Sequence, residues 1–425
     1  MRISRTHGLI ALAVATAAVL PAAPLAAAAP AASSVSRAST YFSVSNYRVL
    51  DTRVGNGATG PSGPGSVVRL DIAKKLGLSN GTIPTAVVLN LTVVDPTAGT
   101  FVSAYPTGGE RPTVSNVNVA PGPGVTTNRA TVQVSKDGYV DVYNHAGTTD
   151  LVADIQGFYT GVGENGTLTG STYIPGEPTR LLDTRTDTGG LPGKVGPGEQ
   201  IVADVSGALN PDTTDTDLVL QLTATNASAP SFVTAYAATL NYLPNTSDLN
   251  FAAGQSVTNL AFVDVDKKGL ALYNHSGSTD LVMDYVGAFE HHRDAGSPGA
   301  SGLFLPAAPT RVLDTRSGNG APATRVGADQ AIRVKVSDLP GAPAPDKLGA
   351  VVLNLTATNA SEGSYVTAYA ADGSPRPGTS NLNFTAGRNT AAMAIVPVSQ
   401  DGYVNLYNHS GSVDLIADVQ GYYTY

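Results

Sequence analysis

Short apolar stretches separated by clusters of Gly, Pro, Asn and Asp make up the pattern of hydrophobic and polar positions along the chain. These stretches are rich in Val, Leu, Tyr and Thr, which favours strands over helices. In the first third of the chain we expect strands at 67–72, 86–94, 100–105, 129–134 and 139–143, a hairpin turn at Ser135 and a short helical turn only at 73–78. The pattern predicts roughly seven to nine strands in two packed sheets.

This pattern occurs three times. Arg48-Val-Leu-Asp-Thr-Arg53 recurs at Arg180 and Arg311, and Tyr143-Asn-His-Ala-Gly147 recurs at Tyr273 and Tyr407. A period of about 130 residues is far longer than that of a solenoid, so each copy is expected to be a whole domain. We predict an all-β fold of three tandem, jelly-roll-like β-sandwich domains of about 115 residues. They are placed at 41–160 (the first repeat), 172–290 (the second repeat) and 303–425 (the third repeat), with Gly-rich linkers at 161–171 and 291–302.

The beginning of the chain has the pattern of an export signal. Arg2 and Arg5 precede an apolar run from Leu9 to Leu20 and an Ala-rich stretch, which predicts a signal peptide at 1–29 and a flexible leader at 30–40. The run is too short for a comfortable membrane span, and no later stretch of about 20 apolar residues occurs. We therefore expect a secreted, extracellular protein, free or associated with the cell surface, with no transmembrane segment in its mature form.

Charge and cysteine content exclude several functions. The net charge of −8 and a pI near 5.2 argue against a nucleic-acid partner, because such binding depends on Lys and Arg. The chain contains no Cys, so disulfides, thiol nucleophiles and Cys-based zinc sites are excluded. No cofactor is expected.

The closing strand of each repeat contains an acidic residue in an apolar setting. In Asp150-Leu-Val-Ala-Asp154, alternation places Asp154 among apolar neighbours, where an unpaired carboxylate would be costly. An Arg of the opening motif recurs in every copy and is the expected partner. The predicted structural ion pairs are Arg53–Asp154, Arg185–Asp284 and Arg316–Asp418. A calcium or ligand site built from the same acids is the alternative, although no Asp-x-Asp-x-Asp-Gly loop occurs and no metal ligands are assigned.

Polar residues of two other motifs are the candidate ligand contacts. Each repeat has one His in an expected hairpin loop, which is either a tolerated turn residue or a contact to a sugar. Asn116 and Asn118 share one face of an expected strand, and could contact one ligand or bond the backbone instead. The tentative binding residues are Asn116, Asn118, Asn144, His145, Asn250, Asn274, His275, Asn381, Asn383, Asn408 and His409.

A catalytic site is not expected. Ser276, His275 and Asp280 contain the residue types of a nucleophilic triad, but the Ser is replaced by Ala146 in the first repeat. No Gly-x-Ser-x-Gly elbow occurs, and residues so close in sequence rarely form the required line of contacts. We predict that the protein is not an enzyme.

The opening Leu-Asp-Thr-Arg, the segment Ser380-Asn-Leu-Asn383 and the closing Ala417-Asp-Val-Gln-Gly-Tyr-Tyr423 resemble a repeat found in exported proteins of actinobacteria such as streptomycetes. The resemblance covers 47–159, 177–289 and 308–425. It implies domains that occur in tandem or are joined to secreted hydrolases, and it assigns no catalytic residues. The second repeat departs most, with Asp248 in place of Asn and Ala288 in place of an aromatic residue.

The sequence favours a non-catalytic, multivalent binder of cell-envelope or environmental polysaccharide. Three weak sites on flexible linkers gain avidity without a strong single contact. One alternative is a structural or adhesive surface protein whose partners are other proteins or further copies of itself. Another is an accessory protein of a hydrolase.

Overall fold

The computed structural model describes residues 38–78, 81–162, 170–209, 216–265, 269–291 and 302–425. The signal peptide, most of the predicted leader and most of both linkers lie outside the described residues. The first strand begins at Ser39, two residues earlier than the predicted domain boundary. Within the described ranges no helix has the length and apolar character needed to cross a bilayer.

Eight strands are described in each repeat. The first repeat has β1 (Ser39–Asp51), β2 (Val67–Asp71), α1 (Ile72–Leu76), β3 (Ala86–Val94), β4 (Thr100–Pro106), β5 (Val117–Val119), β6 (Val125–Gln133), β7 (Tyr139–Asn144) and β8 (Asp150–Gly161). The second has β9 (Ser171–Asp183), β10 (Glu199–Ala203), η1 (Ser206–Ala208), β11 (Thr216–Thr225), β12 (Ser231–Ala237), β13 (Leu249–Phe251), β14 (Val257–Val265), β15 (Leu270–Asn274) and β16 (Asp280–His291). The third has β17 (Phe304–Asp314), β18 (Gln330–Lys335), η2 (Pro345–Lys347), β19 (Leu348–Thr358), β20 (Ser364–Ala370), β21 (Leu382–Phe384), β22 (Thr390–Pro397), β23 (Tyr403–Asn408) and β24 (Asp414–Thr424).

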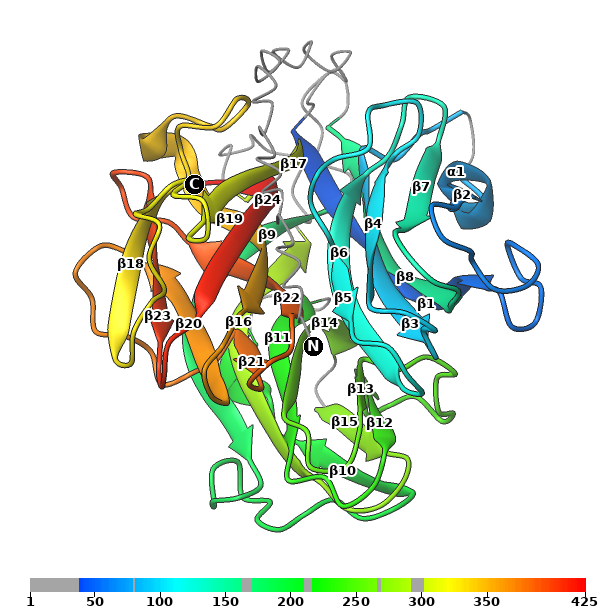
Figure 1. Ribbon diagram of the computed structural model, residues 1–425. Helices are drawn as coiled ribbons and strands as arrows, with labels where there is room; N and C mark the ends of the chain where they lie inside the picture. Colours follow the sequence, from blue (N-terminus) through cyan, green and yellow to red (C-terminus); the bar gives the residue numbers. More distant parts are fainter. Residues whose placement is uncertain (1–37, 79–80, 163–169, 210–215, 266–268, 292–301) are drawn as a thin grey trace, which may run out of the picture. The chain divides into compact units, whose positions relative to one another are not determined.

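The strand order within each repeat is that of a jelly roll. In the first repeat an inner sheet has the order β1-β8-β3-β6, an outer sheet has the order β2-β7-β4-β5, and all pairs are antiparallel. The other two repeats reproduce this order, in green and in yellow to red in Figure 1. The predicted all-β, jelly-roll-like fold is confirmed, and the strands expected from the sequence match the observed ones closely.

The central strands of the inner sheets, such as β3 and β8, are buried on both faces. Every residue of β3 is buried, and apolar residues lie on both of its faces, with Asn90 and Thr92 as its polar positions. Leu89 and Leu91 point into the core of the first repeat's own sandwich. Val88, on the opposite face, packs into a cluster shared with the other repeats. Apolar residues at both odd and even positions are therefore needed because both faces of the strand are covered.

Seven aromatic rings from the three repeats meet in this shared cluster. Rings of the opening strands pack on rings of the closing strands of other repeats, with centroid distances of 4.0 Å for Tyr41–Phe289, 4.3 Å for Tyr159–Phe304 and 4.4 Å for Tyr173–Tyr423. Each repeat thus contacts the other two, and the contacts follow one cyclic order. Strands β1, β9, β17 and β24 come together in Figure 1.

The Gly of the closing motif is required by this packing. A Cβ at Gly157 would lie 2.3 Å from the Tyr41 ring, and Gly287 and Gly421 have the same relation to Tyr173 and Phe304. The register of each closing strand shifts next to this Gly. The recurring Gly followed by two aromatic or small residues is therefore a packing motif of the inner sheet.

The repeats combine separate cores with a common one. Each sandwich encloses its own apolar cluster, and the shared cluster joins all three. Ser34–Tyr425 forms one compact unit. Three sandwich cores thus lie inside a continuous structure, and the division into three domains stays a prediction.

Two loops expected to be hairpins connect different sheets. The turn at Ser135 joins β6 of the inner sheet to β7 of the outer sheet, and the Tyr-Asn-His-x-Gly loop joins β7 to β8 of the inner sheet. The hairpin prediction is wrong at both places. Local turn chemistry indicates a chain reversal but not which strands pair afterwards.

Candidate functional site

Opening and closing strands are tied together by an ion pair in every repeat, but through a different Arg from the one predicted. Arg48 lies opposite Asp154 in the strand register and binds both of its oxygens, Nε to Oδ1 at 2.8 Å and Nη2 to Oδ2 at 3.1 Å. Arg53 follows the end of β1 and instead binds Asp51 with two bonds, at 2.8 and 2.7 Å. Asp51 also contacts Arg48 at 3.4 Å.

The other repeats have the same arrangement, so the predicted pairs Arg53–Asp154, Arg185–Asp284 and Arg316–Asp418 are wrong in their Arg partner. The observed pairs are Arg180–Asp284, Arg311–Asp418, Arg185–Asp183 and Arg316–Asp314, besides those of the first repeat. Counting alternate residues along β1 does not identify the partner of Asp154, because β1 contains register shifts on both sides of Arg48. The architectural role predicted for the closing Asp agrees with this geometry.

The two carboxylates of this network have opposite pKa shifts. Hydrogen bonds from Arg53 hold the pKa of Asp51 below its ordinary value, and the same holds for Asp183 and Asp314. Burial raises the pKa of Asp154 above its ordinary value, although Arg48 opposes this change. Asp284 and Asp418 show the same upward shift in pKa from burial.

Two sets of the candidate Asn side chains are committed to the fold. Asn144 is fully buried and donates to the carbonyl oxygens of Ser62, Gly63 and Gly147, which holds the Tyr-Asn-His-x-Gly loop. Asn274 and Asn408 repeat these bonds. Asn116 is also buried and accepts from the backbone N–H of Ala104, as Asn381 does from Ala368.

The third set of Asn side chains lies at contacts between repeats. Asn250 donates to Thr127 of the first repeat at 2.6 Å, and Asn383 donates to Thr258 of the second repeat. Asn118 has no such partner: its Nδ2 is buried without a hydrogen bond. Asn118 is therefore a candidate with a buried amide donor that forms no hydrogen bond with a described residue.

The three candidate His residues are exposed and stack on aromatic rings. His145 lies on Phe101 with centroids 4.3 Å apart and planes 15° apart. The equivalent pairs are Phe232–His275 at 4.5 Å and Tyr365–His409 at 4.6 Å. The backbone N–H of each His donates to the carbonyl oxygen of its aromatic partner, which fixes the stack. We call Phe101–Tyr143–His145 and its two counterparts, Phe232–Tyr273–His275 and Tyr365–Tyr407–His409, the aromatic–imidazole clusters.

A hollow of about 430 Å³ adjoins the first of these clusters. It is lined by Phe101, Asn118 and His145 of the first repeat and by 387–389 of the third repeat. The structure therefore brings together Asn118 and His145, two of the residues proposed from the sequence, and completes their site with a loop that sequence reasoning did not include.

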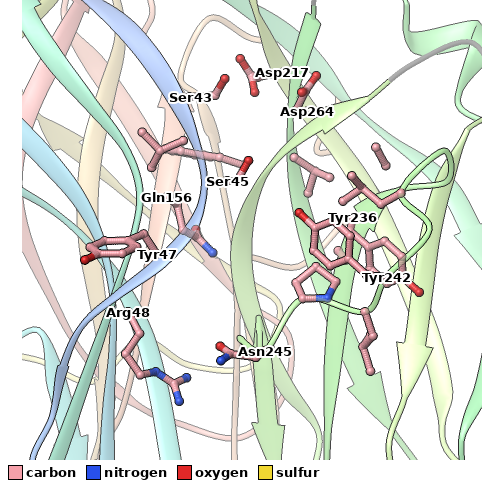
Figure 2. A pocket seen from close by; sticks show the side chains of 18 residues that line it. Ser43, Ser45, Tyr47, Arg48, Gln156, Asp217, Tyr236, Tyr242, Asn245 and Asp264 are labelled. Carbon is pink, nitrogen blue, oxygen red and sulfur yellow. The ribbon is translucent and has the colours of Figure 1, made fainter. Parts of the chain in front are cut away.

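A larger cleft, of about 600 Å³, lies between the first and second repeats. Figure 2 shows Tyr47 and Arg48 on the first repeat's side and Tyr236 and Tyr242 on the second repeat's side. At the contact between the third and first repeats, Gln420 accepts from the backbone N–H of Thr131. The equivalent Gln156 lines the cleft, and its Oε1 has no partner. The cleft thus lies where the bond equivalent to that of Gln420 is absent between the first and second repeats.

A buried charge pair joins the first and second repeats. Arg129 is fully buried and its Nη2 lies 2.8 Å from Oδ1 of Asp248, which also accepts from Gln156. Burial lowers the pKa of Arg129 from its ordinary value even though Asp248 opposes this. The contact between the third and first repeats is neutral: Asn128 donates to Asn354, which donates to the carbonyl oxygen of Ser115.

Sequence reasoning missed this pair, although a signal was present. Arg129 stands where the other repeats have Leu260 and Met393, and Asp248 stands where they have Asn116 and Asn381. Arg129 and Asp248 are oppositely charged residues at positions that are neutral in the other repeats, and this pairing of exceptions indicates a contact between them. The departure of Asp248 is thus explained by its partner in another repeat.

The described part of the chain contains no group of three or more His, Asp or Glu side chains arranged to hold a metal. The exposed groups that remain for chemistry are aromatic rings, imidazoles, amides and isolated charges. Such groups can stack on a ligand and donate or accept hydrogen bonds.

Comparisons with known proteins were made at the level of sequence and of structure. No family model matches the chain, and no curated protein matches it. Among solved structures it is similar to one described as "The Triple Jelly Roll Fold and Turret Assembly in an Archaeal Virus", with 10% identity over 91% of this chain and 90% of that one and a TM-score of 0.18. A second, from Sulfolobus Turreted Icosahedral Virus, is 11% identical over 86% of this chain and 84% of that one, with a TM-score of 0.17. At such TM-scores the likeness supports no inference about role or ligand.

Proposed function

We propose that the protein is a non-catalytic, multivalent binder of extracellular polysaccharide, and that its contacts to sugar are the three aromatic–imidazole clusters. The proposal rests chiefly on one observation. Each repeat presents an exposed His stacked on a ring, and the pairing is kept although the ring is Phe in two repeats and Tyr in the third. Exposure of the His supports a role beyond the packing of the core.

The chemistry of the clusters suits a sugar. Aromatic faces offer an apolar surface to the C–H face of a pyranose, while the Tyr hydroxyl and imidazole nitrogens serve its hydroxyl groups. The Tyr143 hydroxyl lies 3.4 Å from Nδ1 of His145, and Arg111 covers the Tyr143 ring at 4.1 Å. The third repeat has the same cation over Tyr407, from Arg376 at 3.9 Å.

The packing of the repeats favours multivalent binding. The shared core holds the three clusters at defined spacings, so a second contact to a long polymer loses less entropy than it would on flexible linkers. The cleft of Figure 2 also presents exposed Tyr47 and Tyr242 rings. Its lining residues belong to the first and second repeats, whereas a cluster is present in every repeat, so we assign the repeated contact to the clusters. Export to the extracellular space is proposed from the sequence of the first 29 residues.

Retention on insoluble peptidoglycan, chitin and cellulose tests the proposal. The full chain should be retained on at least one of these polymers and released by soluble fragments of it. Combining His145→Ala, His275→Ala and His409→Ala should abolish retention, whereas each single change should weaken it by roughly tenfold, as expected when one of several linked contacts is lost.

Lys136→Gln is the matched control, because Lys136 is 86% exposed and pairs only with the adjacent Asp137 among the described residues. It should bind like the parent. Undiminished retention of the triple variant would contradict the assignment of the clusters. Sedimentation of the parent into large assemblies without any polymer would favour the adhesive alternative, since β2 and its counterparts are edge strands that could pair with another copy.

A further inference from the structure

The contact between Asn118 and the third repeat, beside the hollow, lacks a hydroxyl that the two equivalent contacts have. Asn250 is the equivalent of Asn118 in the second repeat. The Thr127 hydroxyl of the first repeat bonds both Asn250 and Thr92 on the neighbouring strand. Asn383 is the equivalent residue in the third repeat. The Thr258 hydroxyl of the second repeat bonds both Asn383 and Thr223. The residue that stands at this position beside Asn118 is Ala391, which cannot form either bond.

Two polar atoms are left without partners as a result. Nδ2 of Asn118 and Oγ1 of Thr356, the residue opposite Ala391, are both buried and unpaired. Buried polar atoms are nearly always hydrogen-bonded, so two of them around one absent hydroxyl indicate an oxygen supplied from outside the chain. The Nδ2 atom is itself covered, so the amide must turn slightly to meet such an oxygen.

The rim of the hollow adds positive charge. Arg388 lines it, is exposed, and forms no ion pair with a described residue. The corresponding residues of the other repeats are Pro123 and Gln255, which are uncharged. No carboxylate occurs among the residues that line the hollow. A guanidinium, an imidazole and an unused amide donor therefore surround one space.

We propose that this hollow binds an anionic group of a saccharide, a carboxylate or a phosphate, and that the first repeat thereby selects acidic polymers. The guanidinium of Arg388 pairs with the anion, the amide of Asn118 donates to one of its oxygens, and the sugar ring lies against the Phe101–His145 stack. This inference rests on the proposed polysaccharide binding and names its ligand class at one of the three clusters.

Matched sugars test the ligand class directly. Titration calorimetry of the full chain with D-galacturonate and with D-galactose compares two sugars that differ in a carboxylate. We expect galacturonate to bind at least about tenfold more tightly, the size of one charge-assisted hydrogen bond. Inorganic phosphate is the second anion. Displacement of bound galacturonate by phosphate supports a phosphate-bearing polymer, and galacturonate binding that phosphate does not weaken supports a uronic acid.

Two variants locate the site. Ala391→Thr supplies the hydroxyl found in the other repeats, so it should satisfy Asn118 and Thr356, leave the melting temperature unchanged or higher, and weaken galacturonate binding about tenfold or more. Arg388→Gln should weaken galacturonate binding similarly and leave galactose binding unchanged. Lys136→Gln removes one positive charge from the first repeat outside the hollow, and should bind galacturonate like the parent.

The outcomes separate this inference from the function on which it rests. Equal affinity for the two sugars, or galacturonate binding that survives both variants, would overturn the inference while retention on neutral polymers still supported the function. A more stable Ala391→Thr protein with unchanged galacturonate binding would show that a water molecule fills the hollow, which also overturns it. Galacturonate binding that responds to the variants, without retention on any polymer, would support the anion site and reject multivalent polysaccharide binding.

Discussion

The polar network inside each repeat and the polar network between repeats differ in how faithfully they are copied. Inside a repeat, Arg48, Asp51 and Asp154 form a network that recurs almost atom for atom in the other two copies. Between repeats, one contact contains the charge pair Arg129–Asp248 and another contains the neutral pair Asn128–Asn354. An interaction within one repeat can be kept in each copy separately, whereas an interface residue is free to change when its partner in another repeat changes with it.

The largest expected effect comes from breaking the buried charge pair. Asp248→Asn leaves Arg129 charged and unpaired in the core, and should lower the free energy of unfolding by about 3 to 5 kcal/mol. Urea denaturation of the full chain measures this. Adding Arg129→Leu reproduces the Leu260 and Asn381 found at the equivalent positions and should recover most of the loss. A single variant as stable as the parent would show that the two residues are not coupled.

The network inside the repeat should show unequal contributions from its two Arg residues. Asp154→Ala removes the buried partner of Arg48, whose side chain is 25% exposed, and should cost about 2 to 4 kcal/mol. Arg53→Gln should cost less than about 1 kcal/mol, because Arg53 is 44% exposed. Thermal and urea unfolding of both variants provide the comparison. If Arg53→Gln were as costly as Asp154→Ala, the assignment of Arg48 as the partner of Asp154 would fail.

The Asp residues of the internal network should have opposite effects on the pH dependence of stability. The pKa of Asp51 is lowered in the folded state, so its contribution is present above the ordinary value of 3.8 and is lost as the pH falls through the lowered pKa. The pKa of Asp154 is raised, so its contribution is present below 3.8 and is lost as the pH rises through the raised pKa. Melting temperatures between pH 7 and pH 3 should therefore fall less steeply on acidification in Asp51→Asn, and more steeply in Asp154→Asn, than in the parent. Parallel curves for the two variants would contradict these directions.

The smallest expected effect is a gain in stability. Gln221 is buried and neither amide atom has a partner, whereas Asn90 and Asn354 at the equivalent positions donate to Ser247 and Ser115. Gln221→Asn should allow the same bond to the third repeat and raise the free energy of unfolding by up to about 1 kcal/mol, the net value of one hydrogen bond. The reverse change, Asn354→Gln, should lower it. Denaturation midpoints that move in the same direction for both would refute the explanation.

Most of the strands could be predicted from the sequence because strand patterning is local. The expected strands at 86–94 and 139–143 agree with β3 and β7 to within one residue. The association of the repeats was not predicted, although the apolar residues at both odd and even positions of β3 were a signal that both of its faces are covered. Alternation alone gave no way to choose Arg48 over Arg53, because register shifts in β1 change which residue lies opposite Asp154.

The candidate site was predictable in part. His145 and Asn118 were named from motifs, and they do line one hollow. Asn144 was named for the same reason but is used to hold its own loop, because an Asn in a turn commonly bonds the backbone. Arg388 and Ala391 could not be found from one repeat, since their importance depends on which repeat packs against which.

The cyclic order of the aromatic contacts has a consequence for how the chain acquires its structure. Tyr159 meets Tyr423, 264 residues further along, so part of the inward face of the first repeat has no partner until the last strand has been made. During synthesis that apolar face therefore stays exposed to solvent until most of the remaining chain has left the ribosome. Removing the final strand should therefore affect a repeat that was translated long before it, unlike the loss of an end unit in a linear array of repeats.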